Sequence, residues 1–394
     1  MAIKKIVENV INVGVEHWDR EIFDSLIPLP DGTTYNSYVI KGSEKIALID
    51  TVDETKGHLL KENLKNLGIE RLDYIIANHA EQDHSGYIPA ILNMFPGAKV
   101  VTNTKCKGML IDLLHVKDED FIVIEDGEEI SLGDKTLKFI LTPWVHWPET
   151  MSTYLKEDKI LFSCDFFGSH YATSDTFVVD EAKTLMDAKR YYAEIMMPFR
   201  KMVARNVEKV NQYELNMIAP SHGPVYKNPK LIINAYKEWV SDDVKNVVLL
   251  LYISMHGSTE KIAEHLIDSL IAKGIEVKPF NVLTADIGQI AIAMVDACTI
   301  ILASPMVLAG AHPGMISVAH LANALRPKVK NAAIVGSYGW GGNMVEQIKS
   351  VIPNLKVDLF EPVLIKGLPR DDDYKKLDKL IDEVAAKHVI DCNL

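Results

Sequence analysis

The sequence predicts a two-domain α/β protein, with a mixed α/β or α+β N-terminal domain and a C-terminal domain built on an open, doubly wound parallel sheet. Three observations predict this class: the length of 394 residues, a change of pattern near residue 242, and the alternation of strand-like and helix-like segments beyond it. At about 150 residues per domain, such a chain accommodates two large domains. We expect them to cover residues 1–243 and 244–394.

The predicted boundary lies between a helix and a buried strand. Residues 230–240 have helical character, and the polar residues 241–243 follow them. Residues 246–253 (NVVLLLYI) are then a continuous apolar run. A run of this length is typical of a parallel strand that is buried on both faces.

Beyond the boundary, strands and helices alternate. Residues 246–253, 299–304 and 332–337 are predicted strands. Between the first two, residues 259–273 carry apolar side chains at helical spacing, and Gly274 is a suitable residue to end this helix. The alternation predicts the doubly wound sheet.

The N-terminal part has a mixed pattern, in which short strand candidates recur between helical stretches. The predicted helices include residues 56–67 and 185–205. The predicted strands are residues 46–51, 73–77, 137–142, 160–163 and 217–219.

Composition disfavours several classes of function. The net charge is −12, and no Lys/Arg-rich run is present to neutralise the phosphates of a nucleic acid. No apolar run approaches the roughly 18 to 20 residues that span a bilayer, and the first residues do not resemble a secretory signal. The cysteines are scattered and form no CxxC pair, so we expect no disulfide framework and no zinc or iron–thiolate centre; they are Cys106, Cys164, Cys298 and Cys392. We therefore expect a cytoplasmic protein with no nucleic-acid or membrane partner.

Metal-ligating side chains follow several predicted strands. Four such side chains lie within six residues directly after the strand 73–77, and three more each follow another strand end. Because the carboxyl ends of parallel strands share one edge of a sheet, we expect them to form a single site. The predicted ligands are His79, Glu81, Asp83, His84, His146, Asp165 and His222. Lone histidines such as His115 and His388 receive no role.

The chemistry of this donor set indicates the metal. Imidazoles and carboxylates without a thiolate suit iron or manganese, and zinc remains allowed. Two ferrous ions, three carboxylates and one bridging hydroxide have a combined charge of zero, which suits a buried site. Asp165 lies apart from the first four ligands in sequence, so we expect it to bridge the two metals.

Three loops after consecutive strands of the C-terminal domain form a second candidate site. The first is rich in hydroxyls and opens a helix, where phosphate binds well, although a plain helix cap is the alternative. It lacks the lysine of a Walker loop and the GxGxxG of a dinucleotide fold, so it fits the phosphate of a flavin mononucleotide (FMN). Its residues are Ser254, Met255, His256, Gly257, Ser258 and Thr259.

The other two loops suit a flat ring. Glycines let the backbone approach such a ring closely, and neighbouring aromatic side chains can cover its face. The second loop comprises Ser304, Pro305, Met306 and Val307. The third comprises Ser337, Tyr338, Gly339, Trp340, Gly341 and Gly342.

Through these residues the whole chain resembles the flavodiiron proteins, also called A-type flavoproteins. The resemblance implies a metallo-β-lactamase-like αββα sandwich followed by a flavodoxin-like domain. Zinc hydrolases of the same superfold carry the motif HxHxDH, whereas flavodiiron proteins have glutamate at its third position. Glu81 occupies that position here.

The resemblance also implies a role for each candidate residue. His79, Glu81 and His146 are expected to bind one iron, with Asp83, His84 and His222 on the other and Asp165 bridging them. His170 matches a family histidine that lies near the site and is usually not a ligand, and we expect it to help protons reach the site. The first C-terminal loop matches the segment that holds the FMN phosphate, and the other two match the segments around the flavin ring.

The implied function is the reduction of dioxygen to water at a diiron centre. FMN and a diferrous pair together store the four electrons that this reaction needs. An external donor, such as rubredoxin, a flavoprotein reductase or a reduced deazaflavin, is expected, because no rubredoxin-like CxxC module is present. A head-to-tail homodimer or a homotetramer would bring the FMN of one chain to the irons of another.

Three alternatives remain open at the level of sequence. The same site could reduce two nitric oxide molecules to nitrous oxide. A zinc hydrolase fused to a flavodoxin-like module is a second alternative, disfavoured by Glu81. A non-enzymatic electron carrier with a vestigial metal domain is the third, disfavoured by the complete set of seven ligands.

Overall fold

The protein is described by a computed structural model, which defines residues 3–392. Contacts between Cα atoms divide the chain into two compact units. The first comprises the chain up to Tyr192 together with Phe199–Val240, and the second comprises Ala193–Pro198 and the chain from Ser241 onward. Within residues 3–392, no helix has the length and apolar character needed to cross a membrane.

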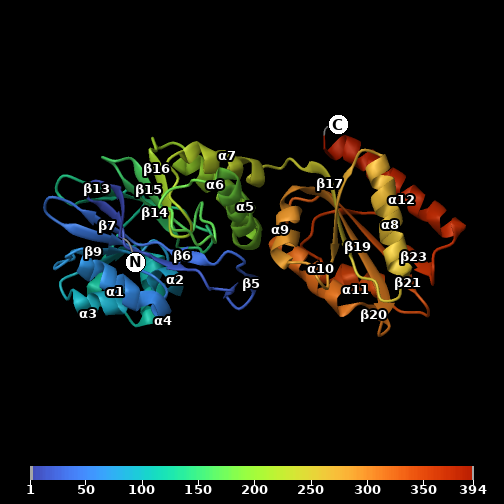
Figure 1. Cartoon of the computed structure of the whole chain (residues 1–394), viewed down its shortest axis with the longest axis horizontal. Helices are drawn as coiled ribbons and strands as arrows, with labels where there is room; N and C mark the ends of the chain where they lie inside the picture. The colour runs from blue at the N-terminus through green and yellow to red at the C-terminus, as the bar shows by residue number, and fades with distance from the viewer. Residues whose placement is uncertain (1–2, 393–394) are drawn as a thin grey trace. The chain divides into compact units, whose positions relative to one another are not determined.

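The first unit contains two β-sheets that face each other (Figure 1). The larger sheet has the order β1-β2-β7-β8-β9-β10-β11, and β8 to β11 run parallel. Its strands are β1 (Lys4–Val7), β2 (Val10–Asn12), β7 (Tyr38–Lys41), β8 (Ile46–Ile49), β9 (Tyr74–Ile76), β10 (Lys99–Thr102) and β11 (Phe121–Val123). In the smaller sheet, neighbouring strands are also consecutive in the chain. They are β12 (Glu129–Ser131), β13 (Thr136–Leu141), β14 (Met151–Leu155), β15 (Ile160–Cys164) and β16 (Met217–Pro220).

Helices cover the outer faces of both sheets, which completes an αββα sandwich (Figure 1). Those beside the larger sheet are α1 (Gly57–Asn66), α3 (Ile88–Met94) and α4 (Thr104–Leu114). Those beside the smaller sheet are α5 (Glu181–Tyr191), α6 (Arg200–Val210) and α7 (Pro229–Val240). The short helix α2 (Gln82–Ser85) follows β9. Two small ribbons pair β3 (Val15–His17) with β6 (Thr33–Tyr35), and β4 (Ile22–Phe23) with β5 (Ile27–Pro28).

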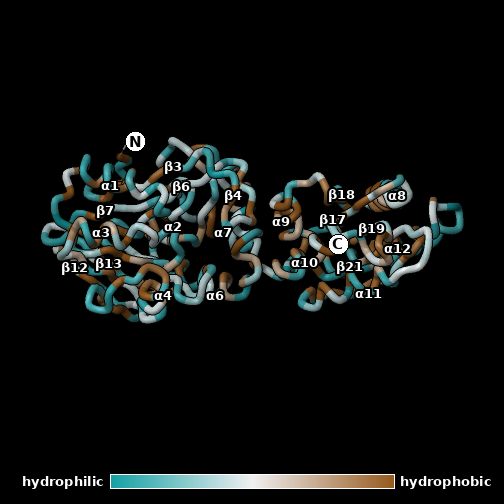
Figure 2. Tube along the Cα trace, turned by 90° about the horizontal axis from the view of Figure 1, so that it is seen from below, coloured by the Kyte–Doolittle hydropathy of each residue, from teal (hydrophilic) through white to brown (hydrophobic). Residues whose placement is uncertain are grey.

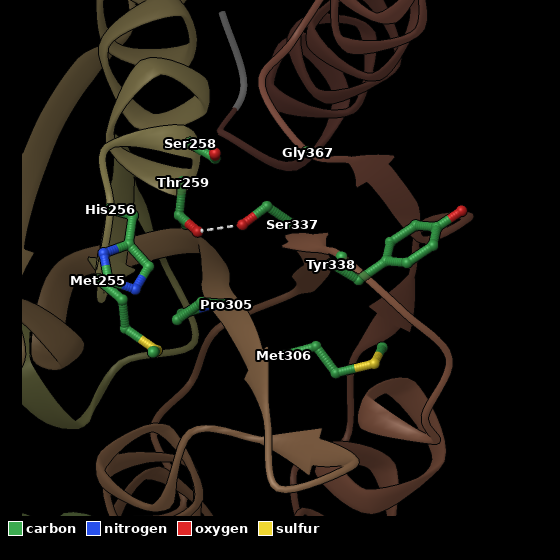
Figure 3. A pocket seen from close by; sticks show the side chains of 10 residues that line it. Met255, His256, Ser258, Thr259, Pro305, Met306, Ser337, Tyr338 and Gly367 are labelled. Carbon is green, nitrogen blue, oxygen red and sulfur yellow. Dashed lines mark hydrogen bonds between the residues drawn. The ribbon is translucent and has the colours of Figure 1, made fainter.

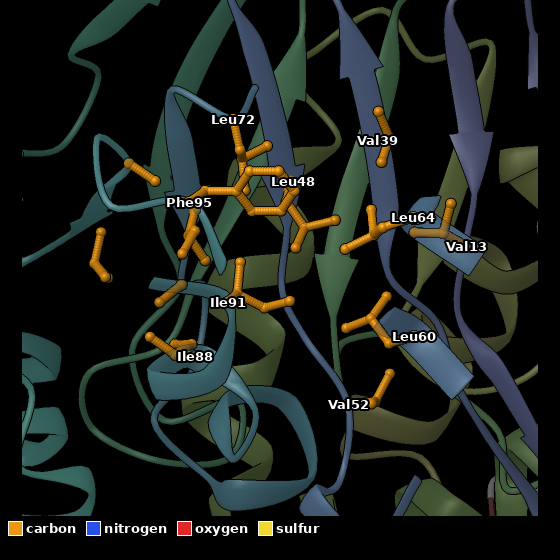
Figure 4. Packing of buried hydrophobic residues seen from close by; sticks show 14 of the residues in the cluster. Val13, Val39, Leu48, Val52, Leu60, Leu64, Leu72, Ile88, Ile91 and Phe95 are labelled. Carbon is orange, nitrogen blue, oxygen red and sulfur yellow. The ribbon is translucent and has the colours of Figure 1, made fainter. Parts of the chain in front are cut away.

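The alternation of side chains along each strand separates two hydrophobic cores. On the larger sheet, Val39 and Leu48 point toward the helices, where they pack near Leu60 and Ile91 (Figure 4). Their sequence neighbours Tyr38, Ile40, Ala47 and Ile49 point the other way, into the core between the two sheets. A strand whose faces are both buried needs apolar residues at consecutive positions, and the predicted strand 46–51 has them.

The second unit is a parallel sheet with the order β18-β17-β19-β21-β22, and β23 also pairs with β21. In chain order this is 2-1-3-4-5, the flavodoxin-like arrangement. The strands are β17 (Lys245–Tyr252), β18 (Glu276–Asn281), β19 (Ala297–Val307), β21 (Asn331–Tyr338), β22 (Asp358–Leu359) and β23 (Val363–Lys366). The short strand β20 (Gly310–Ala311) folds back on the end of β19.

Helices lie on both faces of this sheet. Leu266 of α8 (Ser258–Ala272) and Leu380 of α12 (Asp371–Asp391) pack into one core with the central strands. The remaining helices are α9 (Ile287–Asp296), α10 (Pro313–Leu325) and α11 (Met344–Val351). The helix α9 is almost entirely hydrophobic (Figure 2).

Some predicted elements differ from the observed ones. The predicted helix 185–205 is not a regular α-helix throughout. The helix α5 ends at Tyr191, a π-helical turn (Tyr192–Met196) and a 3-10 turn with Pro198 (Met197–Phe199) follow, and α6 begins at Arg200. Proline lacks an amide hydrogen and cannot continue a regular helix. The edge strand β18 was not predicted, since it contains Pro279 and polar residues, which edge strands tolerate. The predicted helix 259–273 is confirmed as α8, and Gly274 follows its end with a φ of 77°.

Candidate metal centre and flavin pocket

The seven predicted metal ligands come together at the ends of strands from both sheets of the first unit. His79 and Glu81 follow β9 of the larger sheet, and the next two ligands lie in α2. Asp165 and His222 follow β15 and β16 of the smaller sheet. His146 lies in the loop between β13 and β14. We expected a single sheet edge, but the site is built where the edges of two facing sheets meet.

The first group of ligand atoms surrounds one carboxylate oxygen of Asp165. The Nε2 atoms of His79 and His146 lie 3.1 and 3.0 Å from Glu81 Oε2. The same two nitrogen atoms lie 3.4 and 3.3 Å from Asp165 Oδ2. These four residues form one of the groups that could hold a metal ion.

The second group surrounds the other oxygen of Asp165. His84 Nε2 and His222 Nε2 lie 2.9 and 3.4 Å from Asp165 Oδ1. They lie 3.2 and 3.1 Å from Asp83 Oδ2. Ligands held about 2.1 Å from a metal ion are about 3 Å from one another, so both groups have the dimensions of a metal site. Asp165 therefore offers one oxygen to each of two neighbouring sites.

Unpartnered polar atoms in the cluster indicate that a ligand is needed. Among the described residues, both carboxylate oxygens of Asp83 and Asp165 and Nε2 of His84 and His222 are buried without a hydrogen-bond partner. Buried polar atoms in native proteins are nearly always partnered. Metal ions bound between these atoms would satisfy them, so the residues present fit a pair of metal ions.

The charges of the cluster would favour a bound cation. Burial alone would lower the pKa of His146 and His222, but the nearby carboxylates of Asp165 and of Glu81 or Asp83 raise these pKa values to about 9 and about 10. Burial opposes ionisation of Asp165, yet the neighbouring imidazoles hold its pKa well below the usual range. Asp165 is therefore ionised, and its negative charge would stabilise metal ions in place of the protons.

Two hydrogen bonds fix the orientation of ligand imidazoles. His79 Nδ1 donates to Glu149 Oε1 at 2.7 Å, and Ala80 N donates to the same oxygen at 3.1 Å. His222 Nδ1 donates to the carbonyl oxygen of Thr34 at 2.6 Å. In each case the Nε2 atom is left facing the cluster, as a metal-ligating histidine requires. Sequence reasoning missed Glu149, although it is a carboxylate only three residues after His146.

His170 lies beside the cluster and belongs to neither ligand group. Its ring centroid is 4.8 Å from that of His222, and its Nδ1 lies 2.9 Å from Thr33 Oγ1. Burial holds the pKa of His170 well below its usual value, so the ring is neutral. The expected part of His170 in proton delivery stays a prediction.

The three predicted loops of the second unit meet at one pocket, at the carboxyl ends of β17, β19 and β21 (Figure 3). It is lined by Met255, His256, Ser258, Thr259, Pro305, Met306, Ser337, Tyr338, Gly339 and Gly367. Gly367, which follows β23, was missed because that short strand was not predicted. The predicted residues that do not line the pocket are Ser254, Gly257, Ser304, Val307, Trp340, Gly341 and Gly342.

The geometry of the first loop suits a phosphate group. Gly257 precedes α8 with a φ of 86° and has no side chain to cap the helix. Ser254 Oγ accepts hydrogen bonds from Gly257 N and Glu260 N, both at 3.2 Å, so the amide groups of Ser258 and Thr259 are the ones that suit an anion. The hydroxyls of Thr259 and Ser337 are 2.8 Å apart and link the first loop to the third (Figure 3). A Cβ at Gly339 would meet no atom within 4 Å, so the wall of the pocket is open there. These features fit a phosphate beside a flat ring.

Comparisons with known proteins cover the whole chain. Residues 33–223 match the family model described as "ODP family beta lactamase". The chain is 34% identical to a nitric oxide reductase of Moorella thermoacetica, over 97% of this chain and 98% of that protein. It is 33% identical to a coenzyme F420H2 oxidase of Methanothermobacter marburgensis, over 91% of this chain and 92% of that protein.

Solved structures agree with the observed fold. The rubredoxin oxygen:oxidoreductase of Desulfovibrio gigas superimposes with a TM-score of 0.93 at 29% identity, over 98% of both chains. The flavodiiron protein of Giardia intestinalis superimposes with a TM-score of 0.94 at 25% identity, over 100% of this chain and 98% of that chain. The predicted combination of a metallo-β-lactamase-like and a flavodoxin-like domain is thereby confirmed.

Proposed function

The chain belongs to the flavodiiron protein family of oxidoreductases, and we propose that it reduces dioxygen to water at the seven-residue cluster, with electrons passed through FMN from an external donor. The observation that carries this proposal is the division of Asp165 between two ligand groups, with Oδ1 in one and Oδ2 in the other. A shared carboxylate is the arrangement that a dinuclear centre needs. The boundary between residues 243 and 244 and the roles of the individual ligands are part of the same proposal.

When bound, two ferrous ions and a reduced FMN supply four electrons, the number that converts one dioxygen to two waters. The protein holds the ligand atoms in place before any metal arrives. Glu149 and the Thr34 carbonyl fix the imidazoles of His79 and His222 by hydrogen bonds. Burial of the carboxylates excludes water and strengthens their attraction for cations.

Nitric oxide reduction is the second candidate reaction, because the relative in Moorella thermoacetica is named a nitric oxide reductase. The same ligands serve both reactions, so a rate comparison separates them. We would reduce the iron- and FMN-loaded protein without oxygen, mix it with dioxygen or with nitric oxide, and follow the absorbance of flavin and iron. Fast reoxidation by dioxygen with little nitrous oxide is expected. Rapid formation of nitrous oxide with a sluggish dioxygen reaction would assign the alternative.

A zinc hydrolase is the competing class, and metal analysis separates it. The proposal expects two iron ions per chain and a flavin. A protein that retained zinc, held no flavin and reacted with neither gas would contradict the proposed function.

We propose that two chains pair head to tail, so that the FMN of one lies near the metal cluster of the other. Large apolar side chains are exposed on the first unit at Trp18 and Leu26 and on the second at Leu308 and Trp340, as an interface would need. The donor is a small electron carrier or a reduced cofactor; rubredoxin, a flavoprotein reductase and a reduced deazaflavin are the candidates.

A mixing experiment tests this pairing. A metal-deficient variant, Asp165→Asn, and a flavin-deficient variant would each be inactive alone. Denaturing and refolding them together should restore part of the oxidase activity if electrons cross between chains. No recovery, with heterodimers demonstrated by mass spectrometry, would contradict the head-to-tail arrangement.

A further inference from the structure

Two cysteines that are distant in sequence meet at the edge of the second unit. Cys298 is the second residue of β19, and Cys392 is the first residue after α12. Their sulfur atoms and a ring nitrogen of His388 all lie within 4.8 Å of one another. The scattered cysteines gave no sign of a pair in the sequence, because the fold alone brings the end of α12 to the start of β19.

The two thiols differ in their accessibility. Cys298 is fully buried, and its sulfur accepts a weak hydrogen bond from Asn331 Nδ2 at 3.8 Å. Cys392 is partly exposed, and its thiol donates to the carbonyl oxygen of Lys245 at 3.6 Å. An accessible thiol beside a buried one can react first with an external disulfide, and the buried thiol can then resolve the mixed disulfide that forms.

The hydrogen bonds of the third group, His388, favour thiol chemistry over metal binding at this site. Its Nδ1 lies 2.8 Å from Asn246 Oδ1, and its Nε2 lies 2.8 Å from Thr299 Oγ1. Both ring nitrogens therefore already have partners. A metal ion would have to break one of these bonds and would find only three protein ligands, so the geometry favours chemistry between the sulfurs.

We propose that Cys298 and Cys392 form a reversible disulfide that ties the C-terminal helix to the sheet of the flavin-binding unit. The oxidant is a small-molecule disulfide. The Cys392 thiolate attacks one of its sulfurs and releases one thiol, and Cys298 then attacks the Cys392 sulfur and releases the second. Two electrons pass from the cysteines to the small disulfide, and their two protons leave on the released thiols.

The bond would enclose most of the flavin-binding unit. The segment between the two cysteines contains β19, β21 and β23, together with the two loops expected around the flavin ring. A cross-link of this length restricts the unfolded chain and so favours the folded unit. Burial raises the pKa of both thiols, so the reduced pair is unreactive toward weak oxidants and the reaction is slow.

Thiol counting on the full, iron- and FMN-loaded chain tests the proposal. The protein would be incubated with oxidised glutathione, denatured in acid, and its free thiols counted. The expected count falls from four to two per chain, with peptides containing Cys298 and Cys392 linked in the mass spectrum, and dithiothreitol restores four. Cys392→Ser should show no linked peptide, and Cys106→Ala, as the control, should still form the bond.

Stability provides a second measurement. The oxidised wild-type protein should release its FMN at a temperature several degrees higher than the reduced protein, and Cys392→Ser should show no such difference. A count that stays at four, or links that involve Cys106 or Cys164, would overturn the proposal. So would a third metal ion per chain that protects both thiols from oxidation and is lost in Cys392→Ser, because the group would then be a metal site.

Discussion

The metal cluster and the flavin pocket are built in different ways. The cluster consists of side chains, almost all of them buried, whose donor atoms are already 2.9 to 3.4 Å apart. The pocket is lined by residues of several loops and of the first turn of α8, and Met255, which lines it, is 47% exposed. A buried cluster of donor side chains fails when one donor is lost, whereas an open pocket shared by several loops tolerates most single substitutions. We therefore expect the two regions to respond independently and with very different sensitivity.

The largest expected effect is at Asp165. Asparagine in its place offers one good oxygen instead of two and removes the negative charge shared by both groups. Asp165→Asn should lower bound iron from two per chain to less than one, while FMN stays at one per chain. Iron analysis and flavin absorbance measure both contents. The exposed Asp112→Asn is the matched control, and an unchanged iron content in Asp165→Asn would refute the shared-carboxylate arrangement.

A smaller effect on the same cluster is expected at Glu149. Glu149→Gln keeps the size of the side chain but weakens its hydrogen bond to His79, so iron affinity should fall about 10- to 100-fold. A competitive chelator titration gives the affinity, and the reduction potential of the irons should shift as well. FMN content should not change. The exposed Glu119→Gln should behave as wild type, and equal affinities in both variants would remove the positioning role.

Metal binding at the cluster should release protons from its histidines. The metal-free imidazoles of His146 and His222 have pKa values of about 9 and about 10, so both are protonated at neutral pH and must lose a proton to bind a metal. Iron affinity should therefore rise between about pH 6 and pH 8, and protons should appear in a weakly buffered solution as iron is added. An indicator dye records them. Iron uptake without proton release would contradict the assignment of these ligands.

The smallest expected effect is in the flavin pocket. Thr259→Val removes the hydroxyl that lies 2.8 Å from Ser337 Oγ at the start of α8. FMN affinity should fall about tenfold, as the loss of one hydrogen bond predicts, while iron content is unchanged. Fluorescence titration of the FMN-free protein measures the affinity, with the exposed Thr284→Val as control. A loss of iron in Thr259→Val would show that the two regions are not independent.

The difference between the regions also explains what the sequence could predict. The seven candidate ligands could be proposed from the sequence because metal-binding side chains are rare and these follow predicted strands. Their division into two groups came from the family resemblance and stays a prediction; it is supported by the two oxygens of Asp165, which lie near different imidazoles. Glu149 escaped notice because nothing in the sequence indicates that its side chain reaches His79 Nδ1.

The flavin pocket was harder to predict residue by residue. It is lined by several loops, and the identity of a loop residue says little about whether it faces the pocket. Trp340 was expected to cover a ring, yet it is 68% exposed and does not line the pocket. Gly367 lines it after a strand too short to predict. The paired cysteines show the same limit, since their proximity depends on where α12 ends.

The most direct test of the proposed function is an electron count. Wild-type protein with two irons and one FMN per chain would be fully reduced without oxygen and titrated with dissolved dioxygen, while absorbance and peroxide are measured. The account predicts complete reoxidation at one dioxygen per chain with no peroxide released. Release of hydrogen peroxide at two dioxygen per chain, or no reoxidation of the loaded protein, would contradict it.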